Sequence, residues 1–119
     1  MQHIESDEQK ALFQWIDYNK NKYEELETIY HIPNGGKRNA REAARLKQEG
    51  VRAGVPDVHL PIPKGMYIGL WIEMKAPGGK LTNYQKDWKN KLESWGHKVI
   101  VCYNWEEAKN SILKYLEVS

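Results

Sequence analysis

The chain has 119 residues, of which 40% are hydrophobic and 29% charged, and its 18 basic and 16 acidic side chains give a net charge of +2. This length predicts one domain over residues 1–119, the apolar content argues against intrinsic disorder, and the charge neither requires nor excludes a polyanionic partner. Cys102 is the single cysteine, which excludes an internal disulfide and a cysteine zinc cluster. With no leader pattern and no run of about 18 apolar residues, we expect a cytoplasmic protein that does not enter a membrane.

The first half of the chain predicts two helices and a short strand. Residues Ser6–Gln9 read as a capping box in front of a helix over about 7–20. The β-rich segment 28–32 predicts a short strand, and the Asn-Gly-Gly sequence at 34–36 predicts a turn. Good helix formers over 38–48 then predict a second helix.

The second half predicts three strands and two helices. Residues 57–60 and 68–75 alternate between apolar and polar side chains, and 99–103 form a compact apolar run, so each segment predicts a strand. A helix begins after Thr82 and runs to about residue 95, and a last helix follows Asn104. The order helix, strand, helix, strand, strand, helix, strand, helix predicts an α/β fold, a mixed sheet flanked by helices.

The aromatic residues are unevenly used, with five Trp and seven Tyr against one Phe. Trp and Tyr are amphipathic, so they suit a binding surface as well as a core. On the helix after Thr82, the large apolar side chains fall on one stripe: Tyr84, Trp88, Leu92 and Trp95.

Asp57, Glu73 and Lys75 form the candidate reactive group. Alternation places Glu73 and Lys75 on one strand face, and antiparallel pairing with the preceding strand would bring Asp57 near Glu73. Two carboxylates held together are costly unless a cation lies between them. Mg²⁺ or Mn²⁺ bound through oxygen would relieve that cost and activate a water for phosphodiester hydrolysis, while the lysine orients the water or neutralises the phosphate. Taken singly, the Glu-x-Lys pattern also fits a same-face structural pair, and Pro-Asp fits a turn.

The motifs Gly54-Val55-Pro56-Asp57 and Glu73-Met74-Lys75, with Gln85, resemble the PD-(D/E)xK nuclease superfamily and, more narrowly, the virus-type replication-repair nuclease (VRR-NUC) domain. The resemblance covers nearly the whole chain and includes Pro33–Arg38 and Lys47–Gly50. It implies a PD-(D/E)xK nuclease-like fold and a metal-dependent endonuclease, often acting on branched DNA. Stand-alone members of this size behave like Holliday junction resolvases, commonly as homodimers, and a viral source would place the protein in the host-cell cytoplasm.

The resemblance also implies roles for individual residues. Asp57 and Glu73 would be metal ligands, together with the backbone carbonyl of Met74. Lys75 would be the catalytic lysine, and Gln85 would support the active site from the following helix.

Two of these assignments have alternatives. Gln85 also fits a capping box with Thr82, and we expect that one rotamer cannot satisfy both demands. Glu8 matches a glutamate on the N-terminal helix that would complete the metal site, although a first-turn acid is also favourable to the helix dipole. Asp7 and Glu5 are weaker competitors for that position.

The DNA-binding prediction rests on the basic segment between residues 34 and 52. Its turn amides and cations suit phosphate groups, whereas the alternative is a plain turn followed by a solvated helix face. The predicted DNA contacts are Asn34, Lys37, Arg38, Arg41 and Arg52.

Three functions follow from these residues. The favoured one is an endonuclease for branched DNA, particularly four-way junctions. A restriction-type duplex endonuclease is disfavoured because little chain is left for a base-reading module, and a non-catalytic branched-DNA-binding module is disfavoured because the acidic pair and Lys75 are intact. His59, two residues after Asp57, is expected to be a polar neighbour rather than a metal ligand.

Overall fold

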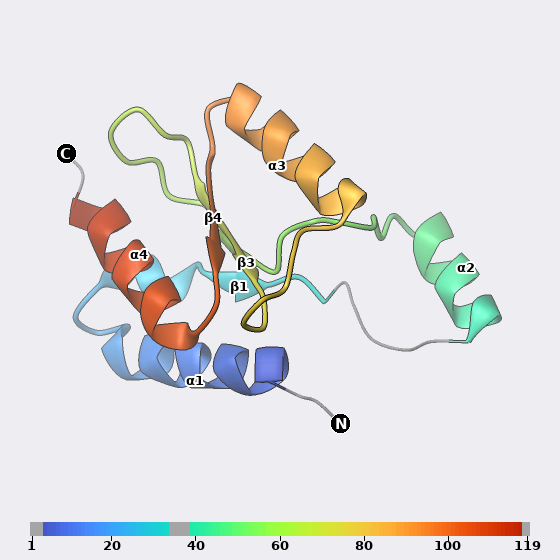
Figure 1. Cartoon of the computed structure of the whole chain (residues 1–119). Coiled ribbons are helices and arrows are strands. Elements are labelled where there is room, and N and C mark those ends of the chain that lie inside the picture. Colours follow the sequence, from blue (N-terminus) through green and yellow to red (C-terminus); the bar gives the residue numbers. More distant parts are fainter. Residues whose placement is uncertain (1–3, 34–38, 118–119) are drawn as a thin grey trace.

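The computed structural model describes residues 4–33 and 39–117, which follow the predicted order of elements (Figure 1). A short 3₁₀ helix, η1, is an addition to that order. The elements in chain order are α1 (Ile4–Asn19), η1 (Glu24–Glu27), β1 (Tyr30–His31), α2 (Ala40–Gln48), β2 (Val58–Leu60), β3 (Leu70–Met74), α3 (Asn83–Ser94), β4 (Lys98–Cys102) and α4 (Trp105–Glu117).

The four strands form one mixed sheet in the order β1-β2-β3-β4. β1, β2 and β3 pair antiparallel, and β4 joins β3 in parallel after the α3 crossover. In the β2–β3 register, Val58 lies opposite Ile72 and His59 lies opposite Trp71. Continuing this register by one residue brings Asp57 level with Glu73. The predicted mixed α/β fold is confirmed, and the predicted hairpin pairing is present.

One face of the sheet carries the hydrophobic core. Alternate residues of β2 and β3 point to this face, and α1 and α4 pack against each other and against β3. Figure 1 shows the two helices side by side next to the sheet. The fully buried side chains of this core include Leu12, Ile16, Val58, Leu60, Leu70, Ile72, Ala108, Ile112 and Tyr115.

The opposite sheet face is only partly covered, by α3, which packs against β4. Thr82 caps α3 as predicted, and its hydroxyl accepts a hydrogen bond from the amide of Gln85 at 3.1 Å. The aromatic stripe of α3 does not enter the core, since within the helix only Leu92 is buried. Tyr84 and Trp95 are 68% and 66% exposed, so most of the stripe is surface.

The first helix and first strand differ from the sequence prediction. α1 begins at Ile4, so Ser6 lies inside its first turn and is not the N-cap. Glu5 and Asp7 in that turn are favourable to the positive end of the helix dipole, which supports the earlier start. β1 is limited to two residues, Tyr30 and His31, which pair with His59 and Val58 of β2.

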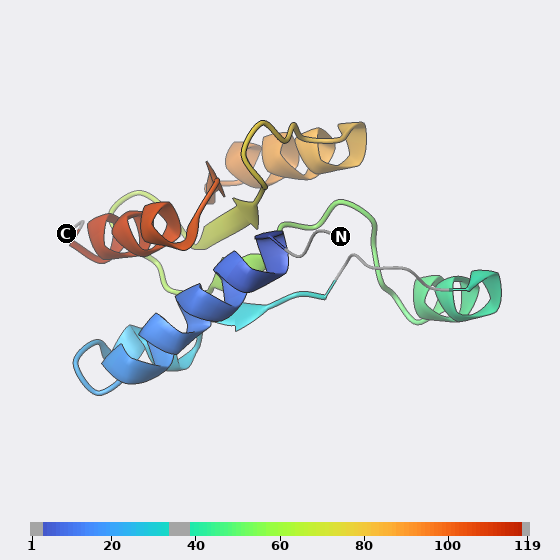
Figure 2. The same ribbon diagram turned by 60° about the horizontal axis from the view of Figure 1, so that its bottom comes forward.

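α2 stands apart from the sheet (Figures 1 and 2). Asn39 caps its N-terminus by accepting a hydrogen bond from the amide of Glu42 at 2.7 Å. Its C-terminus closes at Gly50, whose φ of +111° suits glycine. None of its residues is buried, so this helix offers surface on several sides. In the described part of the chain, no helix has the length and apolar character needed to cross a membrane.

Candidate active site

Glu73 is the one buried charged side chain among the described residues, with 4% of its surface exposed. It lies on β3 next to core residues, although its side chain points to the α3 face. Its Oε1 is buried and has no hydrogen-bond partner among the described residues. An unpartnered buried carboxylate oxygen is costly in free energy, and such groups usually serve a ligand or a reaction.

The pKa of Glu73 is raised to about 9, first by burial and then by the nearby Asp57 carboxylate, through repulsion and a hydrogen bond. The charge of Lys75 opposes this rise, while the more distant Glu5 adds to it. The structure therefore brings together Asp57, Glu73 and Lys75. Without a further cation, the acidic pair holds a proton at neutral pH.

Asp57 is fixed at the entrance to β2 by a hydrogen bond to the next strand. Its Oδ2 accepts from the backbone amide of Met74 at 2.8 Å. The carbonyl of Asp57 also accepts a hydrogen bond from the amide of Ile32 at 2.7 Å. Asp57 is therefore bonded both to the residue that follows β1 and to the last residue of β3. This bonding places one carboxylate beside the backbone of Met74.

Gln85 makes both of the contacts expected of it with one rotamer. Its Oε1 accepts from the amide of Thr82 at 2.8 Å and completes the capping box. Its Nε2 donates to Oε2 of Glu73 at 3.3 Å. The expectation that the two roles exclude each other is wrong, because the carbonyl and amino groups of the side chain point to different partners.

Glu8 does not lie with the acidic pair. Its Oε1 accepts a hydrogen bond from the amide of Trp105 at 2.8 Å, so this carboxylate stabilises the N-terminus of α4. Glu5, one turn earlier, accepts from the amide of Ala76 at 3.3 Å and lines the same hollow as Asp57. The sequence analysis placed Glu5 among the weaker candidates for the metal site, behind Glu8. Because α1 begins at Ile4, Glu5 lies in its first turn.

A hollow of about 270 Å³ opens beside Asp57 between α1 and the sheet edge. Its lining residues are Glu5, Ser6, Gln9, His31, Pro33, Asp57 and Met74. Among the described residues, no three His, Cys, Asp or Glu side chains lie close enough to hold a metal ion together. The candidate side-chain donors are therefore the pair Asp57 and Glu73.

His59 and Trp71 continue the same sheet face one step away from the acidic pair. Their rings stack with centroids 3.8 Å apart and planes within 11°. Nδ1 of His59 shares a hydrogen bond of 2.7 Å with the Tyr30 hydroxyl, and the Trp71 indole donates to Nδ1 of His97 at 3.1 Å. Burial, and then repulsion from His97, lowers the pKa of His59 to about 4. The imidazole is a neutral packed neighbour of the site at physiological pH.

The predicted DNA contacts are only partly placed. Asn34, Lys37 and Arg38 lie outside the described residues. Arg41, on α2, and Arg52, in the connection from α2 to β2, are exposed. Both lie on the segment that projects from the sheet, rather than beside the acidic pair (Figure 1).

A β2–β3 hairpin that presents Asp57, Glu73 and Lys75, backed by α1 and α4 and faced by α3, defines a nuclease fold of the PD-(D/E)xK class. The model of the VRR-NUC domain family matches residues 4–105. The chain therefore belongs to the VRR-NUC domain family, and the suspected resemblance is confirmed.

Two similar proteins agree with this membership. "Putative nuclease p44" of Acyrthosiphon pisum secondary endosymbiont phage 1 is 46% identical over 50 residues, which are 42% of this chain and 52% of that protein. The matched segment thus spans about half the length of that curated relative. A solved structure titled "VRR_NUC domain protein" has a TM-score of 0.81 and 27% identity, over 100% of this chain and 93% of the other. Fold and family together identify a nuclease domain.

Proposed function

We propose that this chain is a divalent-metal-dependent endonuclease that hydrolyses phosphodiesters in branched DNA, with four-way junctions as the first candidate substrate. The observation that supports this most strongly is the buried Glu73 carboxylate, whose Oε1 lacks a partner within residues 4–33 and 39–117 and whose neighbour is a second carboxylate. A bound cation would give that oxygen a partner and offset the repulsion within the pair.

The donors present fit a hard cation. Asp57, Glu73 and the backbone carbonyl of Met74 offer oxygen atoms, which Mg²⁺ and Mn²⁺ prefer. The hydrogen bond from the amide of Met74 to Asp57 keeps this backbone segment beside the carboxylate. When bound, the metal would polarise the scissile phosphate and lower the pKa of a water molecule.

Two further side chains beside the acidic pair have proposed roles in the reaction. Gln85 holds Oε2 of Glu73, which fixes the orientation of the carboxylate and leaves Oε1 for the ligand. Lys75 brings a positive charge to the same strand face, where it orients the attacking water and neutralises charge that develops on the phosphate. Asp57, Glu73 and Lys75 are thus the proposed catalytic residues, with Gln85 as a positioning residue.

The substrate assignment rests on charge and symmetry. Arg41 and Arg52 are exposed on the segment that projects from the sheet, where they are free to meet a phosphate backbone. A homodimer would present two equivalent active sites to two strands, which suits paired nicks in a symmetric junction. The proposal therefore includes a homodimer as the active form.

The test is incubation of the purified protein with labelled four-way junction and with linear duplex of the same sequence, in Mg²⁺, Mn²⁺ or EDTA. We expect metal-dependent cutting of the junction, lost in Asp57→Asn and Lys75→Ala. Asp17→Asn is the matched control, because Asp17 is an exposed carboxylate of α1 in a surface pair with Lys20.

Three outcomes would overturn parts of this proposal. Cutting in EDTA, or full activity in Asp57→Asn, would refute the metal mechanism. Cleavage of linear duplex at defined sequences would favour a restriction-type enzyme. Tight junction binding without cutting in either metal would favour a non-catalytic binding module.

A further inference from the structure

Two adjoining hollows run along the exposed side of α3 and share Arg52, Tyr84 and Trp88. The first, of about 450 Å³, separates α3 from α2, and the second, of about 380 Å³, continues along α3. Both lie within the ~300–1,000 Å³ range of ligand-binding pockets. We call them together the α3 groove. Its lining residues are Ala43, Leu46, Lys47, Val51, Arg52, Ala53, Tyr84, Asp87, Trp88, Lys91 and Trp95.

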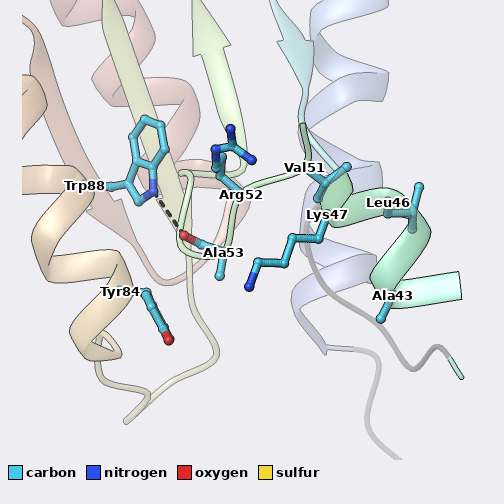
Figure 3. Close-up of a pocket in the computed structure, with 8 residues that line it drawn as sticks. All are labelled: Ala43, Leu46, Lys47, Val51, Arg52, Ala53, Tyr84 and Trp88. Carbon is cyan, nitrogen blue, oxygen red and sulfur yellow. Dashed lines mark hydrogen bonds between the residues drawn. The ribbon is translucent and has the colours of Figure 1, made fainter. Parts of the chain in front are cut away.

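Aromatic rings form the α3 side of this groove. Figure 3 shows Tyr84 and Trp88 on one side, facing residues of α2 across the opening. Tyr84 and Trp95 are mostly exposed, so their ring faces are accessible. The Trp88 indole donates a hydrogen bond to the carbonyl of Ala53 at 3.0 Å, which fixes the orientation of its half-buried ring (Figure 3). Large exposed aromatics held at one place are unusual unless a partner binds there.

Unpaired cations accompany these rings. Lys47, Arg52 and Lys91 line the groove, and in the described part of the chain none of them forms an ion pair within 4.0 Å. Asp87 is the one acidic side chain among the described lining residues. Accessible aromatic faces beside free cations match the two parts of a single-stranded nucleic acid, since bases stack on rings and phosphates pair with cations.

The groove adjoins the acidic pair through two short connections along the chain. Tyr84 is followed by Gln85, which bonds to Glu73. Gly54, which leads through Val55 and Pro56 to Asp57, packs against Tyr84 so closely that an added Cβ would lie 2.6 Å from the Tyr84 carbonyl carbon. The α3 groove is therefore a neighbour of the acidic pair along both α3 and the segment that leads to Asp57, although none of the described residues lines both the groove and the hollow beside Asp57.

We propose that the α3 groove binds unpaired nucleotides adjacent to the cleaved phosphate, with bases stacked on Tyr84 and Trp88 and phosphates paired with Lys47 and Arg52. This inference rests on the proposed function, because it assumes DNA as the substrate of the Asp57–Glu73 site. In a duplex the base faces are already stacked and cannot reach these rings. The groove would therefore favour branched DNA whose branch point exposes unpaired nucleotides, such as a splayed arm or a four-way junction opened at its centre, over linear duplex.

The test is a binding measurement in EDTA, which keeps it independent of cleavage. Fluorescence anisotropy compares a duplex that carries a splayed single-stranded arm with a fully paired duplex of equal length. We expect Tyr84→Leu to weaken binding of the splayed DNA by about 5- to 100-fold, the effect of removing a stacked base contact, while paired duplex binding is unchanged. Tyr84→Phe should retain wild-type affinity. Tyr18→Leu is the matched control, since Tyr18 is 88% exposed on α1.

A second readout reports stacking itself. With 2-aminopurine in the single-stranded arm, the wild-type protein and Tyr84→Phe should quench its fluorescence on binding, and Tyr84→Leu should not. Quenching retained in Tyr84→Leu, equal losses on splayed and paired DNA, or the same loss in Tyr18→Leu would overturn the proposal.

The competing occupant of the groove is a second copy of this chain. Light scattering on the free protein separates the two cases, because a protein interface at the groove would make Tyr84→Leu more monomeric, whereas the nucleotide site predicts no change. The two proposals also fail separately. Splayed-arm binding by a protein that never cuts DNA refutes only the nuclease mechanism, and junction cutting with arm binding unaffected by Tyr84→Leu refutes only the nucleotide site.

Discussion

Gln85 couples the N-terminal cap of α3 to the Glu73 carboxylate. Its two terminal atoms act at once, since Oε1 accepts from the amide of Thr82 at 2.8 Å and Nε2 donates to Oε2 of Glu73 at 3.3 Å. The start of a helix therefore determines how a buried carboxylate is oriented. One consequence is that fold stability and site geometry can be separated by substitution at this residue.

Gln85→Glu should reduce activity with little change in stability. The new carboxylate still accepts from the amide of Thr82, but it cannot donate to Glu73 and adds a third negative charge. A hydrogen bond to a charged group contributes about 1.5–3 kcal/mol, so we expect a loss of about 10- to 100-fold in cleavage rate. Thr82→Ala is the complementary variant, because it removes the hydroxyl acceptor at a cost of about 1 kcal/mol and leaves Gln85 in place. Urea denaturation and initial rates measure the two effects, and equal inactivation of both variants would contradict the separation.

The metal-free protein should lose stability as pH rises. The Glu73 carboxyl titrates near 4.5 when unfolded and at about 9 when folded, so between these values the folded state retains a proton that the unfolded state has released. The contribution of Glu73 to the free energy of unfolding is then fully present below pH 4.5 and is lost towards pH 9, by at most about 1.4 kcal/mol per pH unit. Glu73→Gln should remove this decrease. Urea denaturation in EDTA checks the prediction, and parallel pH profiles for the two proteins would contradict it.

Mg²⁺ should stabilise the protein more at alkaline than at acidic pH. Metal ligands must be deprotonated, so a cation at the Asp57–Glu73 pair displaces the proton held by Glu73. The rise in melting temperature on addition of Mg²⁺ should therefore increase with pH and disappear in EDTA. Asp57→Asn should lose most of this rise, whereas Asp17→Asn should keep it. A thermal shift that does not vary with pH would place the cation elsewhere.

Local sequence signals predicted most of the framework that positions the site. Alternation in β2 and β3 placed Asp57, Glu73 and Lys75 on one side, and the hairpin register brings the two carboxylates level. The caps at Thr82 and Asn104 are short-range signals, and both are present. These features depend on neighbours along the chain, which is why the sequence alone was sufficient.

Other features depend on packing between distant segments. The partner of Glu8 is the amide of Trp105, 97 residues away, and no local pattern indicates that contact. The sequence left open whether the stripe on α3 faces the core or the surface, because periodicity reports which residues share a side, but not whether another element covers it. Only the position of α2, away from the sheet, leaves Tyr84 and Trp88 beside an open groove (Figure 3).

Changing Glu5 and Glu8 to glutamine, one at a time, should have different effects on stability and on the affinity for Mg²⁺. Glu8→Gln removes a negative charge at the N-terminus of α4, which should lower stability by about 0.3–1 kcal/mol and leave the affinity for Mg²⁺ unchanged. Glu5→Gln removes a charge near Glu73 and from the hollow beside Asp57, so it should weaken Mg²⁺ binding with less effect on stability. Titration with Mg²⁺ and urea denaturation give the comparison. A loss of Mg²⁺ affinity in Glu8→Gln alone would restore the original assignment.

Gly54→Ala should lower the free energy of unfolding more than an alanine substitution at another glycine of similar backbone geometry. Gly54 has φ of +91°, where a side chain is strained, and an added Cβ would also lie 2.6 Å from the backbone of Tyr84. Gly50 has φ of +111° but nothing within 4 Å of the added atom, so Gly50→Ala is the matched control for backbone strain alone. Strain at such positions costs about 1–3 kcal/mol, and we expect Gly50→Ala within this range and Gly54→Ala above it. Because the clash would push Asp57 away from α3, Gly54→Ala should also reduce the cleavage rate. Equal free energies of unfolding for Gly54→Ala and Gly50→Ala would show that the close approach to Tyr84 contributes nothing to stability.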